Sequence, residues 1–229
     1  MFKNKKVISI IPAKKESKGL RNKNFLKIKK YSLVELAMLS SKNSSFIDET
    51  VVTSDSELIL SKAKKLKCTI QKRPKFLCRD NTNANEVIRH VLKNIKLSKN
   101  FIIIYLQPTS PFRNHFHINK AFKNLEKYSS TNLMSVKITT EDISKSFSLK
   151  KYLKPNYKKL VNLNRQNLKK FYSANGAIYI FSKYNFCREN KIPQNNIVPF
   201  IMNKIDSFDI NDQLDYLISK TLYKKIIYN

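Results

Sequence analysis

The chain has 229 residues, 41% of them hydrophobic, which is enough for one domain with a substantial core. No apolar run approaches the roughly 18 residues of a membrane span, and the three cysteines lack the spacing of a disulfide framework or a zinc site. A formal net charge of +29 predicts attraction to polyanions, but the lysines are spread along the chain without a nucleic-acid-binding motif. We therefore expect a cytosolic, cytoplasmic protein with no specific nucleic-acid partner and no membrane partner.

Short apolar strands alternate with amphipathic helices in the first half of the chain. The strands are predicted at residues 7–11, 50–53, 68–71 and 101–106. The helices are predicted at residues 33–42, 57–66, 84–97 and 115–128, and the first of them begins at a Ser32/Glu35 capping box. This alternation predicts an α/β fold with a doubly wound, mainly parallel sheet.

The second half of the chain is less regular. Residues 138–172 are polar and rich in lysine, which indicates a small inserted lobe, a dimerisation arm or a lid. Strands are predicted again at residues 177–181 and around 205–210, before a final helix over 212–227. Because no linker divides the chain, we expect a single domain over residues 1–229.

Two polar loops follow predicted strands, at residues 12–24 and 107–113. In doubly wound sheets, ligands bind beyond the carboxyl ends of the strands, where both loops are expected. The first loop places Lys14, Lys18 and Lys23 around Gly19, one of only two glycines in the chain. Glycine among several cations fits a di- or triphosphate, although surface lysines are equally expected in so Lys-rich a chain.

Two side chains beside these loops are suited to recognising a nucleoside. Gln107 can form hydrogen bonds with hydroxyl groups. Arg73 follows a short strand, and its planar guanidinium matches the acceptor atoms of a pyrimidine better than a lysine would.

Four of the 16 acidic residues lie close together, at Asp206, Asp209, Asp212 and Asp215. In such a cationic chain, concentrated carboxylates suggest a site for a divalent cation. The same residues also suit the start of the final helix, as caps and as charges that favour the helix dipole. Both uses can hold at once.

Seven motifs occur in order from residue 7 to about 218. They are Ile11-Pro12-Ala13 with Ser17-Lys18-Gly19-Leu20 and Lys23-Asn24, Thr53-Ser54-Asp55, Arg73-Pro74 with Asp80, Leu106-Gln107-Pro108-Thr109-Ser110-Pro111-Phe112-Arg113, Arg165-Gln166, Asn175-Gly176-Ala177-Ile178-Tyr179, and Asp206 with Asp209-Ile210-Asn211. The series resembles the acylneuraminate cytidylyltransferases, or CMP-sialic acid synthetases. The Ser-Lys-Gly element favours this branch over the Kdo cytidylyltransferases, whose first loop usually lacks it.

The resemblance implies a fold like that of nucleotide-diphospho-sugar transferases. It also implies Mg²⁺-dependent transfer of CMP from CTP to the anomeric hydroxyl of a nine-carbon 2-keto sugar acid, of neuraminic, legionaminic or pseudaminic type, with release of pyrophosphate. Homodimerisation through residues 138–172 follows from the same family.

The resemblance also assigns roles to residues. Lys14, Lys18, Lys23 and Asp209 would be catalytic, and Gly19, Asn24, Arg73, Asp80 and Gln107 would surround the nucleotide. Gln107, Arg165, Gln166, Asn175, Gly176 and Tyr179 would contact the sugar acid, and Asp209 and Asn211 would hold Mg²⁺.

Two positions depart from the family pattern. Lys14 stands where arginine is usual, which keeps the charge but loses bidentate contact with phosphate. Asn211 stands where a second aspartate is usual, so a neutral carbonyl replaces a carboxylate. These departures leave open a non-catalytic relative that binds nucleotides or polyanions. A transferase for Kdo or another keto-deoxy acid is a further alternative.

Overall fold

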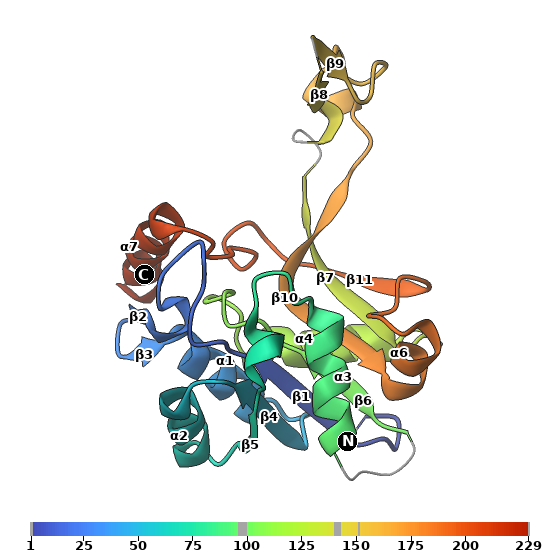
Figure 1. Ribbon diagram of the computed structural model, residues 1–229. Coiled ribbons are helices and arrows are strands. Elements are labelled where there is room, and N and C mark those ends of the chain that lie inside the picture. Colours follow the sequence, from blue (N-terminus) through green and yellow to red (C-terminus); the bar gives the residue numbers. More distant parts are fainter. Residues whose placement is uncertain (1, 96–99, 140–142, 151, 229) are drawn as a thin grey trace.

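The computed structural model describes residues 2–95, 100–139, 143–150 and 152–228, and these form an α/β fold around a seven-stranded sheet (Figure 1). The strand order is β11-β7-β10-β6-β1-β4-β5. The strands are β1 (Val7–Pro12), β4 (Glu49–Ser54), β5 (Thr69–Lys72), β6 (Ile102–Tyr105), β7 (Asn132–Ile138), β10 (Tyr172–Ser182) and β11 (Ile197–Ile201). Strand β10 is antiparallel to β6 and β7, and the other pairs are parallel, so the predicted mainly parallel sheet is confirmed.

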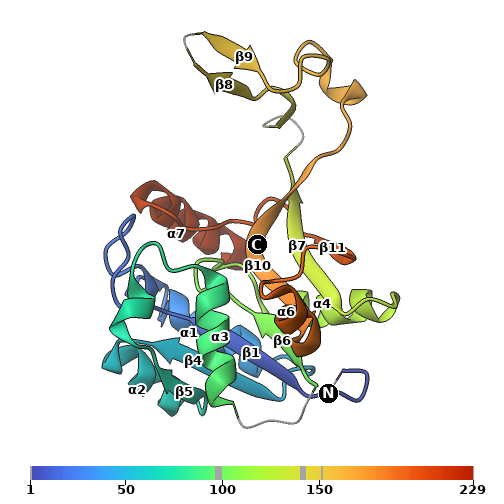
Figure 2. The same ribbon diagram turned by 45° about the vertical axis from the view of Figure 1, so that its right-hand side comes forward.

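Helices cover both faces of this sheet (Figure 2). Helices α1 (Leu33–Lys42), α2 (Glu57–Lys65) and α4 (His115–Glu126) bury their apolar side chains in a core on one face. Helices α3 (Ala84–Asn94) and α6 (Lys183–Glu189) pack in a second core on the other face. The doubly wound arrangement expected from the sequence is therefore present.

Strand β6 shows why the central strands read as continuous apolar runs. Ile102 and Ile104 contribute to the first core, while Ile103 and Tyr105 contribute to the second. Successive side chains of a strand point to opposite faces, and here both faces are covered. All four residues are consequently buried.

Side-chain caps begin the helices that follow the strands. The predicted Ser32/Glu35 capping box is present at α1. Equivalent boxes join Asn83 to Glu86 at α3 and Asn114 to His117 at α4. Each cap satisfies backbone N–H groups that a first helical turn would leave without partners.

The remaining elements are short, apart from one terminal helix. They are η1 (Lys23–Phe25), the pair β2 (Lys27–Ile28) and β3 (Tyr31–Ser32), η2 (Lys75–Cys78), the pair β8 (Phe147–Leu149) and β9 (Leu153–Pro155), η3 (Arg165–Asn167) and α7 (Gln213–Tyr228). Residues 143–150 and 152–171, here called the arm, project away from the sheet beyond β7 and β10 (Figures 1 and 2). None of the helices in the described residues has the length and apolar content needed to cross a bilayer.

The predicted strand around residues 205–210 is wrong. Residues 204–207 form turns in which the Asn203 side chain accepts a hydrogen bond from the backbone N–H of Asp206 (2.8 Å). The backbone N–H of Ser207 donates to the Asn203 carbonyl (3.0 Å). The edge strand is instead β11, whose Pro199 weakens its strand signal in the sequence.

We expect Asn83→Ala to lower the free energy of unfolding by about 1 kcal/mol, because the first turn of α3 loses its cap. Urea denaturation monitored by circular dichroism measures the change. Asn94→Ala, at the exposed other end of α3, is the matched control and should change stability by less than about 0.5 kcal/mol. Equal losses in the two variants would contradict the capping role.

Candidate functional site

A cleft of about 200 Å³ lies at the carboxyl ends of β1 and β6. Its lining comes from four segments: Pro12, Lys14, Ser17, Lys23 and Asn24 of the first loop, Arg73 after β5, Thr82, Asn83, Ala84 and Val87 around the start of α3, and Tyr105, Gln107, Pro108 and Thr109 at the end of β6. The structure therefore brings together residues from both loops singled out by the sequence. This is the edge of a parallel sheet where ligands bind.

Hydrogen bonds hold the first loop in shape. The buried Asn24 side chain donates to the Lys14 carbonyl at 2.7 Å, which makes Asn24 a support of the loop. Lys14 Nζ lies 2.7 Å from Asp80 Oδ1, and Lys18 is exposed. Lys23 Nζ donates to the carbonyl of Ile210 at 2.8 Å. Two of the three predicted phosphate-binding lysines thus line the cleft, and Asp80 pairs with one of them.

Gly19 lets the first loop pack against residues 206–215, here called the acidic segment. A Cβ atom at Gly19 would lie 3.1 Å from the backbone oxygen of Asn211, closer than most side chains tolerate. Together with the bond from Lys23 to Ile210, this contact joins the two segments. The glycine thus favours close approach of two backbones, and a larger residue would have to push the Asn211 carbonyl away by a few tenths of an ångström.

The four aspartates of the acidic segment have different uses. Asp206 lies 3.1 Å from Nε2 of His117, on α4. Asp212 and Asp215 form a reciprocal cap at the start of α7, with Asp215 N donating to Asp212 Oδ1 at 2.9 Å and Asp212 N donating to Asp215 Oδ2 at 3.3 Å. Only Asp209 is left for chemistry at the cleft, so the cap and the metal interpretations apply to different residues.

Asp209 carries the features expected of a metal ligand. Its Oδ1 atom is buried and has no hydrogen-bond partner among the described residues. Burial raises the pKa of Asp209, while hydrogen bonds with Thr109 and Asn211 and the charge of Lys23 oppose the rise. A cation would compensate the unpartnered oxygen.

The carboxylates of the described residues do not form a complete metal site by themselves. No cluster of three or more His, Cys, Asp or Glu side chains in that part of the chain is arranged to hold an ion. Mg²⁺ usually binds through one or two carboxylates together with water and substrate phosphates. Asp209 with the amide oxygen of Asn211 fits such a partial donor set.

Lys23 lies between the lysines of the first loop and the carboxylates of the acidic segment. Burial lowers the pKa of its ammonium, and the nearby charges of Asp209 and Asp215 raise it. The ammonium therefore sits at the junction between the first loop and the acidic segment. A polyphosphate in the cleft would meet positive charge from Lys14 and Lys23 next to the Asp209 carboxylate.

Arg73 is buried behind the cleft, beside Tyr105. Its Nη2 donates to the Thr53 carbonyl at 2.7 Å, and burial lowers the pKa of the guanidinium. The side chain also lines the cleft. Tyr105 was not among the predicted site residues, because its alternation within β6 indicates only core.

Gly176 lies where β10 passes the second loop. Its φ angle is +77°, and a Cβ atom there would lie 2.9 Å from Oε1 of Gln107. The β10–β7 pairing shifts register between Ala174 and Tyr179, which marks an irregularity at this point. Tyr179 lies beyond it, edge-on to Tyr105 with 6.3 Å between ring centroids. Burial and the nearby charge of Asp209 raise the pKa of Tyr179.

Asn175 is turned into the protein. Its Oδ1 accepts hydrogen bonds from Ser135 Oγ at 2.5 Å and from Ala177 N at 3.2 Å. Its Nδ2 donates to Ser207 Oγ at 2.9 Å. The side chain is buried and does not line the cleft, so the predicted sugar contact is corrected to a support of β10, β7 and the acidic segment.

The remaining predicted sugar contacts lie on the arm. Arg165 and Gln166 belong to η3, and Gln166 is exposed. The side chain of Arg165 lies outside the described part of the structure. Gln166 does not line the cleft of its own chain.

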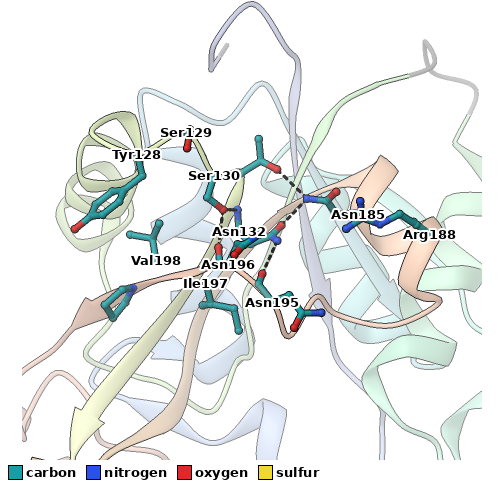
Figure 3. A pocket seen from close by; sticks show the side chains of 12 residues that line it. Tyr128, Ser129, Ser130, Asn132, Asn185, Arg188, Asn195, Asn196, Ile197 and Val198 are labelled. Atoms are coloured by element: carbon teal, nitrogen blue, oxygen red, sulfur yellow. Dashed lines mark hydrogen bonds between the residues drawn. The ribbon is translucent and has the colours of Figure 1, made fainter.

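A larger cavity, of about 590 Å³, lies between the amino-terminal ends of β7 and β11, at the opposite edge of the sheet (Figure 3). Its amides bond to one another: Asn185 Nδ2 donates to Asn132 Oδ1 at 3.0 Å, and Asn132 Nδ2 donates to the Asn195 carbonyl at 3.1 Å. Because these groups are already paired, the cavity is a weaker candidate than the cleft.

Comparisons with curated proteins and known structures identify relatives of this chain. A family model for cytidylyltransferases matches residues 8–221. The N-acylneuraminate cytidylyltransferase of Escherichia coli O18:K1:H7 is 31% identical over 226 residues, covering 96% of this chain and 52% of that protein. The CMP-N,N'-diacetyllegionaminic acid synthase of Campylobacter jejuni is 27% identical, covering 94% of each. The chain thus spans about half the length of the E. coli relative.

Solved structures share the fold at low sequence identity. CMP:2-keto-3-deoxy-manno-octonic acid synthetase, solved with CTP, has a TM-score of 0.72 at 11% identity, covering 96% of this chain and 99% of that one. The 4-diphosphocytidyl-2C-methyl-D-erythritol synthase of Anaerococcus prevotii has a TM-score of 0.67 at 14% identity, covering 96% of each. The structures share the fold, and the family model and sequence matches show that the chain belongs to the cytidylyltransferase family.

Proposed function

We propose that the protein transfers CMP from CTP to the anomeric hydroxyl of a nine-carbon 2-keto sugar acid of the sialic type. The observation that carries the proposal is the position of Lys23, which lines the cleft with Lys14 and lies near the Asp209 carboxylate, whose Oδ1 has no hydrogen-bond partner among the described residues. The names of the N-acylneuraminate and legionaminic acid relatives support the acceptor class.

The reaction is a displacement at the α-phosphorus of CTP. The sugar hydroxyl loses its proton to solvent and its oxygen forms a new P–O bond, the bond between the α-phosphorus and the oxygen that bridges to the β-phosphate breaks, and pyrophosphate leaves with its negative charge. Such transfers depend on positioning and charge neutralisation more than on covalent help. Lys14, Lys18 and Lys23 supply positive charge for the leaving group, and Arg73 and Gln107 border the space for the nucleoside.

We assign the Mg²⁺ contacts to Asp209 Oδ1 and the Asn211 side-chain oxygen. The buried carboxylate oxygen without a partner fits a hard cation, and phosphate oxygens of CTP would complete its coordination. When bound, the ion supplies neutralisation of the phosphate oxygens during displacement.

The proposal extends to a homodimer built through the arm. The arm exposes apolar side chains, including Leu149 at 76% and Leu153 at 65% exposure. Such residues on a projecting element suit burial against a second copy. Because Gln166 lies on the arm and does not line its own cleft, we infer that the arm of one subunit, with Arg165 and Gln166, serves the cleft of its partner.

The assay that tests the function measures pyrophosphate release from CTP and Mg²⁺ with a panel of sugar acids. We expect release with N-acetylneuraminic, legionaminic or pseudaminic acid. Release with Kdo alone would replace the proposed acceptor. CTP binding without release from any acid would instead point to a non-catalytic nucleotide-binding protein.

We expect Asp209→Ala to reduce kcat at saturating CTP by about 10²-fold, because the cation loses its charged ligand. Asp212→Asn is the matched control, since it removes one charge from the same segment while asparagine still caps α7. The control should retain activity, and intact turnover in Asp209→Ala would refute the metal assignment.

The raised pKa of Asp209 adds a pH dependence. A carboxyl whose folded pKa is raised becomes protonated at a higher pH than an ordinary aspartate, and a protonated carboxyl does not bind metal. The Mg²⁺ concentration for half-maximal activity should therefore rise as the pH falls toward that pKa. Titrations of Mg²⁺ at several pH values measure this requirement directly.

Mixing two inactive variants tests the shared site. Arg165→Ala disables the arm and Asp209→Ala disables the cleft, so a mixed dimer has one intact site if the arm acts on its partner. After refolding together at equal concentrations, activity should recover to about one quarter of the wild type. If gel filtration shows that the mixture is dimeric but its activity does not recover, each arm serves its own chain.

A further inference from the structure

Arg113 lies at the end of the second loop and its side chain forms hydrogen bonds with residues of three segments. Its guanidinium is buried, with 2% of the residue exposed. Nη1 donates to the Gln107 carbonyl at 2.9 Å and to the Ala177 carbonyl at 3.2 Å, and Nε donates to Ser40 Oγ at 3.3 Å. One side chain therefore connects the second loop, β10 and α1.

This guanidinium has no carboxylate partner among the described residues. The nearby Asp206 is paired with His117 and accepts a hydrogen bond from Asn203 at 2.7 Å. Arg113 Nη2 is buried without a hydrogen-bond partner in that same part of the chain. Burial lowers the pKa of Arg113 to about 9. Burying a cation this way is costly, and an apolar side chain of similar size would often stabilise a fold as well or better.

The two carbonyls that Arg113 binds lie on either side of the tightest contact in the site. Gln107 borders the cleft through its side chain, and Ala177 directly follows Gly176. A Cβ atom at Gly176 would lie 2.9 Å from Gln107 Oε1, so the Gln107 side-chain amide lies directly against the Gly176 backbone. Arg113 therefore fixes the distance between the second loop and β10 where the Gln107 side chain emerges.

We propose that Arg113 is a positioning residue that fixes Gln107 against Gly176 and thereby sets the affinity of the cleft for the acceptor sugar acid. The inference rests on the proposed function for its acceptor. Among the described groups assigned to the nucleotide, Arg113 contacts Gln107 but neither Arg73 nor the lysines of the first loop, so CTP keeps those contacts when Arg113 is replaced. Its loss should therefore affect the acceptor far more than CTP.

The test compares Arg113→Met with the wild type. We expect the KM for the accepted sugar acid to rise roughly 10- to 100-fold, as expected for a misplaced positioning group. The Kd for CTP, measured by calorimetry, should stay within about twofold, and the urea midpoint should stay equal or rise. Arg113→Lys should give an intermediate KM, because an ammonium keeps the charge without the planar fork.

Ser40→Ala is the matched control. It removes the Nε contact and leaves both carbonyl contacts in place, so its KM for the acid should match the wild type. An Arg113→Met protein that folds with an unchanged KM and kcat would overturn the proposal. Equal weakening of CTP and acid would also overturn it. If Arg113→Met does not fold, Arg113→Lys against Ser40→Ala decides by the same criteria.

A second readout does not depend on activity. Because the chain has two glycines, labelling with ¹⁵N-glycine gives one amide signal each for Gly19 and Gly176. Arg113→Met should shift or broaden the Gly176 signal and leave the Gly19 signal in place. An unchanged Gly176 signal would refute the proposal that Arg113 fixes Gln107 against Gly176. If the wild type releases no pyrophosphate with any acid, but Arg113→Met still shifts the Gly176 signal, the proposed function alone is refuted.

Discussion

The candidate site depends on the contact between the first loop and the acidic segment. Lys23 donates to the Ile210 carbonyl, and Gly19 lies against the Asn211 carbonyl, so two segments far apart in sequence meet at the cleft. The second loop joins the same assembly, because Ile210 N donates to the Thr109 carbonyl at 2.9 Å. The lysines proposed to bind phosphate and the carboxylate proposed to bind metal therefore lie in segments joined by one network of backbone contacts, which would be a form of preorganisation.

The sequence predicted those features that depend on local pattern. The apolar run at Ile102–Tyr105 identifies a strand buried on both faces, and the Ser32/Glu35 box marks the start of α1. The lysines around Gly19 likewise indicated a loop at the carboxyl end of β1. Each of these signals depends on residues that are close to one another in sequence, so it can be recognised without knowledge of the tertiary structure.

Features set by distant contacts were not predictable in the same way. The local pattern predicted the cap that Asp212 and Asp215 form at the start of α7, but it did not show that Asp206 pairs with His117 of α4. Asn175 faces inward because the register of β10 shifts between Ala174 and Tyr179, which reverses the expected alternation. In both cases, the deciding partner is supplied by another element.

The ion pair between Lys14 and Asp80 has a consequence for turnover. Asp80 is exposed, and its Oδ1 lies 2.7 Å from the Lys14 ammonium. In the proposed reaction, a polyphosphate that binds Lys14 would displace this carboxylate, which would cost part of its binding energy. The same carboxylate would stay tethered beside the ammonium at high effective concentration. Asp80 would then act as an internal competitor that favours departure of the anionic product over its retention.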